Sequence, residues 1–146
     1  MKNKIYFLAA IYAIAFVLNF VWENIHARFY AGYGGFWHFF PLTGVATFWD
    51  GAIILGIYIA IALLRRDIYW ARSLNRQSLA GAVVLGIGVA VYIEMRALRE
   101  GRWGYNELMP LIYGLGLTPI LQMIVLPAVS YYLVAKIEKL ENNKNH

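Results

Sequence analysis

Residues 79–98 read LAGAVVLGIGVAVYIEMRAL, and this stretch decides the fold. It carries no charge before Glu94, and about 20 mostly apolar residues suffice for a helix to cross a bilayer. Gly81, Gly86 and Gly88 place small residues along the stretch, and small residues let helices approach each other closely in lipid. The stretch therefore predicts a membrane-spanning helix that packs against a neighbouring helix.

Three further apolar stretches continue this pattern in both directions along the chain. The chain has 146 residues, of which 61% are hydrophobic and 14% charged, so we expect one domain with a composition shifted toward lipid. We predict an all-α fold, a polytopic bundle of four transmembrane helices that forms a single membrane domain over residues 1–146. The expected helices cover residues from about 5 to 22, 48 to 64, 79 to 98 and 108 to 135, followed by a frayed polar tail at 138–146.

The first apolar stretch has some features of a secretory signal peptide. Lys2 and Lys4 form a basic start, and residues 13–15 read Ala-Ile-Ala, like a cleavage site. The apolar run nevertheless continues to Val21 without a polar stretch, which favours a retained helix.

The basic residues predict the orientation of the helices. Nine of them fall on one side of the expected membrane: Lys2, Lys4, Arg65, Arg66, Arg72, Arg76, Lys136, Lys139 and Lys144. Four fall on the other side: Arg28, Arg96, Arg99 and Arg102. By the positive-inside rule, the nine are cytoplasmic, so we expect a multi-pass protein of the cell membrane with both termini in the cytoplasm.

The composition narrows the function classes. The chain has no cysteine, which excludes disulfides and thiolate chemistry, and its net charge of +5 is spread between apolar runs. We therefore expect anionic membrane lipids rather than nucleic acid as partners, with a hydrophobic small-molecule substrate and a homodimer as further options. Glu23 and His26 have the spacing of di-iron ligands, but only one copy is present, so no metal and no cofactor are expected.

The longest expected loop, residues 23–47, is rich in aromatic side chains. It holds Phe29, Tyr30, Tyr33, Phe36, Trp37, Phe39 and Phe40, interrupted by Gly32, Gly34, Gly35 and Pro41. The loop is either an aromatic belt at headgroup level or a lid over a site.

Ionisable residues gather in the outer third of the expected membrane. Asn19, Glu23 and His26 share one face of the first helix, Asp50 begins the second, and Glu94 lies near the outer end of the third. Asp or Arg at a helix centre costs about 2.5–3.5 kcal/mol, so such groups usually face the bundle interior. We therefore predict a polar cavity that opens toward the outer face.

We assign candidate roles to these residues by chemistry. The expected catalytic groups are Glu23, His26, Asp50 and Glu94, and the expected substrate-binding groups are Asn19, Trp22, Trp49, Arg96, Arg99, Trp103, Tyr105 and Gln122. The structural alternatives remain open. The carboxylates and histidines can be interfacial, Asp50 can cap a helix, Glu94 can pair with an arginine, and the arginines can extend to lipid headgroups.

This set of residues favours acid–base chemistry on a lipid. One protonated and one charged carboxyl provide a proton donor and a proton acceptor, and aromatic faces stabilise a carbocation. We expect an isomerase or cyclase that acts on an isoprenoid or sterol-like lipid. A non-catalytic lipid-binding or membrane-complex subunit and a small proton-coupled transporter are the alternatives.

Two sequence segments carry a resemblance to known enzymes. They are Trp49-Asp50 and the series Glu94, Gly101-Arg102-Trp103, Tyr105, Met109-Pro110, Gly116-Leu117-Thr118-Pro119 and Gln122. In style, the chain resembles membrane-embedded lycopene and other terpenoid cyclases and emopamil-binding-type sterol isomerases, although the Pro-x-Glu-Glu of lycopene cyclases is absent. The resemblance implies proton transfer by Glu23, His26, Asp50 and Glu94, with Trp103 beside them. The other reading is a small integral membrane family with its own Glu–Arg–Trp signature.

Overall fold

The computed structural model describes residues 3–144, so Lys2 and the last two residues of the predicted tail lie outside the described residues. The main elements are the helices α1 (Lys4–His26), α2 (Phe36–Arg65), α3 (Arg76–Arg99) and α4 (Leu117–Lys144). Short 3-10 turns, η1 (Ala27–Phe29) and η2 (Trp70–Ser73), follow α1 and precede α3. Four helical segments are long and apolar enough to cross a membrane, which supports a multi-pass membrane protein: Lys4–Phe29, Phe36–Arg65, Arg76–Arg99 and Leu117–Asn143.

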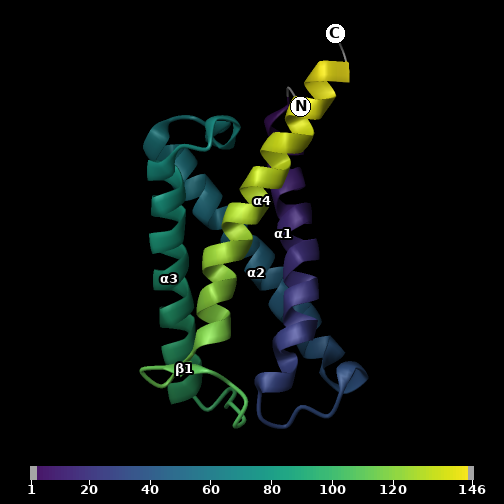
Figure 1. Ribbon diagram of the computed structural model, residues 1–146, viewed down its shortest axis with the longest axis vertical. Helices are drawn as coiled ribbons and strands as arrows, with labels where there is room; N and C mark the ends of the chain where they lie inside the picture. Colours follow the sequence, from purple (N-terminus) through teal and green to yellow (C-terminus); the bar gives the residue numbers. More distant parts are fainter. Residues whose placement is uncertain (1–2, 145–146) are drawn as a thin grey trace.

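The helices form a bundle with two distinct ends (Figure 1). Both chain termini and the connection 66–75 lie at one end, which we call the terminus end. Residues 27–35 and 100–116 lie at the other, which we call the hairpin end. Helix α2 runs diagonally behind α1 and α4, so it lies near α3 at the terminus end and diverges from it toward the hairpin end. The helices α1 and α4 pack on each other between them.

Local sequence signals set several helix ends. The side chain of Asn3 accepts a hydrogen bond from the Ile5 N–H at 2.8 Å, and that of Asn75 accepts one from the Ser78 N–H at 2.8 Å. Each asparagine thus caps unpaired backbone donors at a helix start. Arg66 ends α2 in the left-handed region, with φ of 55°.

Helix α2 begins at Phe36, well before the predicted start at about Phe48. The predicted aromatic loop at 23–47 is therefore wrong in extent, because residues 36–47 are helical and only residues 27–35 connect α1 to α2. Pro41 suggested a break, yet it lies in the second turn of α2, close to the helix start. Asp50 consequently lies inside the helix, which rules out its alternative role as a helix cap.

Helix α4 also begins later than predicted, at Leu117 rather than about Leu108. The strands β1 (Leu111–Ile112) and β2 (Leu115–Gly116) form an antiparallel hairpin before it. Its two turn residues, Tyr113 and Gly114, both have positive φ, 49° and 80°, as a two-residue hairpin turn requires. The short apolar run at 108–112 belongs to this hairpin and not to the helix.

The terminus end contains an ion pair between an exposed arginine and a buried glutamate, which the sequence did not suggest. Glu138 is only 2% exposed, and Arg72 donates to its two oxygens at 2.8 Å and 2.5 Å. Arg72 also lies 3.7 Å from the centroid of the Tyr69 ring. Helix α4 extends to Lys144, so the predicted fraying from Glu138 onward is wrong, because Arg72 anchors that part of the helix.

Candidate functional site

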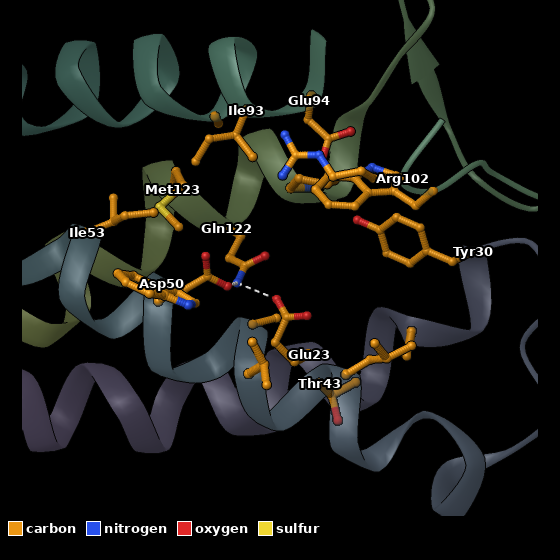
Figure 2. Close-up of a pocket in the computed structure, with 18 of the residues that line it drawn as sticks. Glu23, Tyr30, Thr43, Asp50, Ile53, Ile93, Glu94, Arg102, Gln122 and Met123 are labelled. Carbon is orange, nitrogen blue, oxygen red and sulfur yellow. Dashed lines mark hydrogen bonds between the residues drawn. The ribbon is translucent and has the colours of Figure 1, made fainter. Parts of the chain in front are cut away.

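A pocket with a volume of about 1020 Å³ lies in the hairpin half of the bundle. Residues 39–53 of α2 and 90–96 of α3 face each other across it, where the two helices diverge. Glu23 of α1 and Gln122 of α4 contribute to its inner wall (Figure 2). Pockets of about 300–1,000 Å³ hold most small-molecule ligands, so this one has room for a lipid-sized molecule. Most of its lining is apolar.

Gln122 joins three helices at the inner wall. Its side-chain nitrogen lies 2.8 Å from Asn19 Oδ1, 2.8 Å from Glu23 Oε1 and 2.9 Å from Asp50 Oδ2. Gln122 is 2% exposed and Asn19 is fully buried. Because α1 supplies two acceptors, α2 supplies one and α4 supplies the amide, this network fixes the positions of both carboxyls.

Glu23 and Asp50 present their carboxyls to the same amide nitrogen of Gln122. Two ionised carboxylates offer only acceptors and repel each other. The Gln122 nitrogen has two N–H donors for three acceptors, so it cannot serve all three at once. One proton on the carboxyl pair would supply the missing donor.

His26 lies behind the carboxyl pair and does not line the pocket. Its Nδ1 lies 3.1 Å from the Trp22 carbonyl, and its Nε2 lies 4.0 Å from Glu23 Oε2. The ring is also 5.4 Å from the Tyr30 ring, and His26 is 3% exposed. His26 can therefore orient Glu23 but has no direct access to a molecule in the pocket.

Glu94 forms a second acidic position on the α3 side of the pocket (Figure 2). The Tyr105 hydroxyl donates a hydrogen bond to Glu94 Oε2 and accepts one from the Gly116 N–H at 2.9 Å. Burial raises the pKa of Tyr105, and the negative charge of Glu94 adds to that shift, so the phenol keeps its proton. Because its only proton points at Glu94, that carboxyl acts as the acceptor. No residue in the range 3–144 forms an arginine ion pair with Glu94, so the structural alternative for this residue is wrong.

The backbone around the hairpin end holds Tyr105 in place. The Ala31 N–H donates to the Gly104 carbonyl at 2.9 Å, and the Asn106 N–H donates to the Phe29 carbonyl at 3.0 Å. The Asn106 side chain adds a bond of 2.6 Å to the Arg28 carbonyl. Residues 28–31 and 104–106 therefore form one cover over the site. Tyr30 and Trp103 extend from it to the pocket, with rings 6.2 Å apart.

Two arginines and one glutamate lie at the edge of the pocket. Arg96 Nε lies 2.6 Å from Glu100 Oε1, and Arg102 Nε lies 2.8 Å from Glu100 Oε2. The hydrogen bond from Arg96 lowers the pKa of the Glu100 carboxyl, and Arg102 adds to this effect, so Glu100 is charged at neutral pH. We call these three residues the arginine clamp.

The pocket gathers most of the residues expected from the sequence. Lining residues from that set are Glu23, Trp49, Asp50, Glu94, Arg96, Trp103 and Gln122. Asn19 and Tyr105 do not line the pocket but contact residues that do: Asn19 bonds to Gln122, and Tyr105 bonds to Glu94. Trp22, His26 and Arg99 do not line the pocket: Trp22 packs on the helix core, and Arg99 is exposed. A direct substrate contact is therefore not supported for these three.

Several pocket residues were not singled out as site residues from the sequence. Tyr30, Thr43 and Arg102 are polar, and Ile53 and Met123 are among the others. Tyr30 was counted only as one of many loop aromatics, and no local pattern separates it from Tyr33. The spacing of Thr43, Trp49, Asp50 and Ile53 on one helix face was a usable signal, but only if α2 had been extended to Phe36.

Comparisons with protein-family models, with curated proteins and with solved structures found no match for this chain. The resemblance to terpenoid cyclases and sterol isomerases is therefore not supported at the level of a family. The four candidate spans remain consistent with a small membrane protein.

Proposed function

We propose that this protein is a membrane-embedded isomerase that moves a proton on and off an unsaturated, largely hydrocarbon lipid. The observation that carries the proposal is that Glu23 and Asp50 meet at Gln122 on the inner wall of an apolar pocket, where the amide has too few N–H groups for its three acceptors. We infer that the two carboxyls share one proton. A proton shared by two carboxyls at this wall can be transferred to a double bond of a lipid in the pocket. Glu94, which accepts from Tyr105, provides a separate base on the opposite wall.

The proposed reaction needs no cofactor and leaves the composition of the lipid unchanged. The carboxyl pair protonates one carbon of a double bond, which forms a C–H bond and leaves a cation on the neighbouring carbon. Loss of a proton from an adjacent carbon to Glu94 then forms a new double bond, either directly or after a second double bond closes a ring. Between cycles Glu94 releases its proton to water and the carboxyl pair takes up a proton from water, so solvent deuterium reaches the lipid. One proton enters and one leaves, so charge and atoms balance.

Aromatic side chains around the pocket fit the proposed cation. Tyr30, Trp49, Tyr92 and Trp103 all line it. An aromatic face attracts a nearby cation by about 0.5–2 kcal/mol, more when the site is dry. These rings would stabilise positive charge on the lipid without offering a nucleophile as strong as water.

The proposed orientation puts the terminus end in the cytoplasm and the pocket in the outer leaflet. The basic residues support it, because nine of the thirteen lysines and arginines lie on the terminus side by sequence. The substrate would then enter sideways from the outer leaflet, between the diverging halves of α2 and α3.

The test is the transfer of deuterium from solvent to lipid. The purified protein is incubated in D₂O with a lipid extract of the membranes that contain it, and lipid masses are compared before and after. We expect one lipid class to gain deuterium on carbon with the wild type, and none with Glu23→Gln or Glu94→Gln. Glu107→Gln is the matched control, because Glu107 is exposed and does not line the pocket. Equal labelling with wild type and Glu23→Gln would rule out this function.

A non-catalytic lipid-binding subunit is the second candidate. The hydrogen bonds of Gln122 to Asn19, Glu23 and Asp50 favour it, because they would hold three helices together even if the cluster had no catalytic role. The same experiment separates the two functions, because a binding subunit would retain a lipid without labelling it.

A further inference from the structure

The arginine clamp differs from ordinary interfacial arginines. An arginine that extends to lipid headgroups points away from the bundle along the membrane normal. Here Arg96 and Arg102 converge on one carboxylate, and both line the pocket. Figure 2 places Arg102 on the Glu94 side of the pocket, and its guanidinium carbon lies 5.7 Å from the centroid of the Trp103 ring. Arg99, between them in sequence, is exposed and lies outside the pocket lining.

The clamp has unused hydrogen-bonding capacity. Arg102 meets Glu100 through its Nε, and within residues 3–144 its two terminal nitrogens have no other hydrogen-bond partner. Within the clamp, two arginine charges face the single charge of Glu100. A guanidinium fork matches the oxygens of a carboxylate or a phosphate, and a phosphate has enough oxygens to bind two guanidinium groups at once.

We propose that Arg96 and Arg102 bind the phosphate headgroup of the lipid in this pocket. This inference rests on the proposed function and names its substrate class: an unsaturated amphiphile with a phosphate at the hairpin end. Its hydrocarbon chain passes the Glu23–Asp50 pair and leaves between α2 and α3. The phosphate belongs either to an isoprenyl phosphate or to a glycerophospholipid, which share the chemistry that the clamp recognises.

Glu100 occupies the position of the headgroup when the pocket holds no lipid. Its two oxygens each take one arginine Nε, as two phosphate oxygens would. An incoming phosphate therefore competes with Glu100 for the same donors. Removal of the glutamate charge should strengthen phosphate binding, whereas removal of an arginine charge should weaken it.

The experiment measures binding of matched probes to the full-length protein in phosphatidylcholine nanodiscs. Geranylgeranyl phosphate is compared with geranylgeraniol, and dioleoylphosphatidic acid with dioleoylglycerol, so that each pair differs only in the phosphate. We expect the phosphate member to bind about tenfold more tightly or better, the range for charge-assisted hydrogen bonds. The pair with the larger difference identifies the source of the phosphate.

Four variants test the assignment of residues. Arg96→Gln and Arg102→Gln should each weaken phosphate binding about tenfold and leave alcohol binding unchanged. Arg99→Gln, the matched control, should change neither, and Glu100→Gln should tighten phosphate binding. Unchanged alcohol binding shows that a variant is folded. Arg102→Lys replaces Arg102→Gln if the latter fails this check, and it should weaken phosphate binding because the fork is lost.

The outcomes separate this inference from the proposed function. Equal binding of the phosphate and alcohol probes would overturn the headgroup site. So would an equal loss of phosphate binding in Arg99→Gln and in the Arg96 and Arg102 variants. Deuterium transfer to an uncharged lipid would still support the isomerase in that case. Phosphate binding that depends on Arg96 and Arg102, without any deuterium transfer, would retain the headgroup site and reject the isomerase.

Discussion

The side-chain nitrogen of Gln122 on α4 lies 2.8 Å from Oε1 of Glu23 on α1, and this contact positions the acid of the candidate site. The same nitrogen reaches Asp50 on α2 at 2.9 Å. Three helices that are far apart in sequence therefore meet at one amide, and the carboxyl pair depends on it for both position and donors.

Gln122→Leu should destabilise the protein. Leucine has a similar size but no donor, so the buried oxygens of Asn19, Glu23 and Asp50 lose a partner. Each unpaired buried group costs about 1–3 kcal/mol. We expect a lower thermal midpoint in detergent and no deuterium transfer. Gln77→Leu is the control, since Gln77 is exposed on α3 and should leave both unchanged. An unaltered midpoint for Gln122→Leu would show that the amide is not essential to the bundle.

Tyr105→Phe should loosen the hairpin end and impair the base. The Gly116 N–H loses its acceptor and Glu94 loses its donor, each at a cost of about 1–3 kcal/mol when the group stays buried. Hydrogen exchange of the Gly116 amide should become faster, and deuterium transfer should fall. Tyr113→Phe is the matched control, because Tyr113 is fully exposed. Unchanged exchange at Gly116 would contradict the assigned contact.

Gly86→Ala should disturb the packing of α3 on α4. A Cβ at this position would collide with the Met123 carbonyl oxygen of α4, which is backbone and cannot move aside alone. Overpacking of this kind costs about 1–3 kcal/mol. Gly88→Ala, on the same helix, meets nothing within 4 Å and should be neutral or slightly stabilising. Equal thermal midpoints for the two variants would argue against the close approach.

Membrane orientation is testable because the chain has no cysteine. Ser73→Cys places a thiol at the terminus end, and Tyr113→Cys places one at the hairpin end. We expect an impermeant maleimide added to intact cells to label Tyr113→Cys but not Ser73→Cys. After permeabilisation, the reagent should label both variants. The reverse pattern would place the pocket on the cytoplasmic side.

Much of this architecture could be predicted from the sequence because hydrophobic length and charge position are local signals. The stretch 79–98 and the apolar run after Lys4 lie within helices of the structure. Glu94 was expected to lie near the hairpin end of α3, and it lines the pocket with Glu23 and Asp50. The cost of charge at membrane depth made this convergence predictable.

The rest could not be predicted because it depends on how helices meet. Gln122 was expected among the substrate-binding residues, but no periodicity in the sequence shows that its amide contacts two other helices. Arg72 and Glu138 pair across 66 residues, which no local pattern encodes. Pro41 concealed the first turns of α2, because its effect depends on the distance to the helix start. The hairpin at 108–116 was hidden by its apolar composition.

The most direct test of the central claim is infrared spectroscopy of the carboxyl groups in lipid nanodiscs at neutral pH. The claim is that Glu23 and Asp50 share one proton. It predicts a protonated-carboxyl C=O band in the wild type that is altered by Glu23→Gln or Asp50→Asn alone and absent when both are combined. Glu94→Gln should leave the band in place. A wild type without this band, or a band that persists in the double variant, would contradict the account.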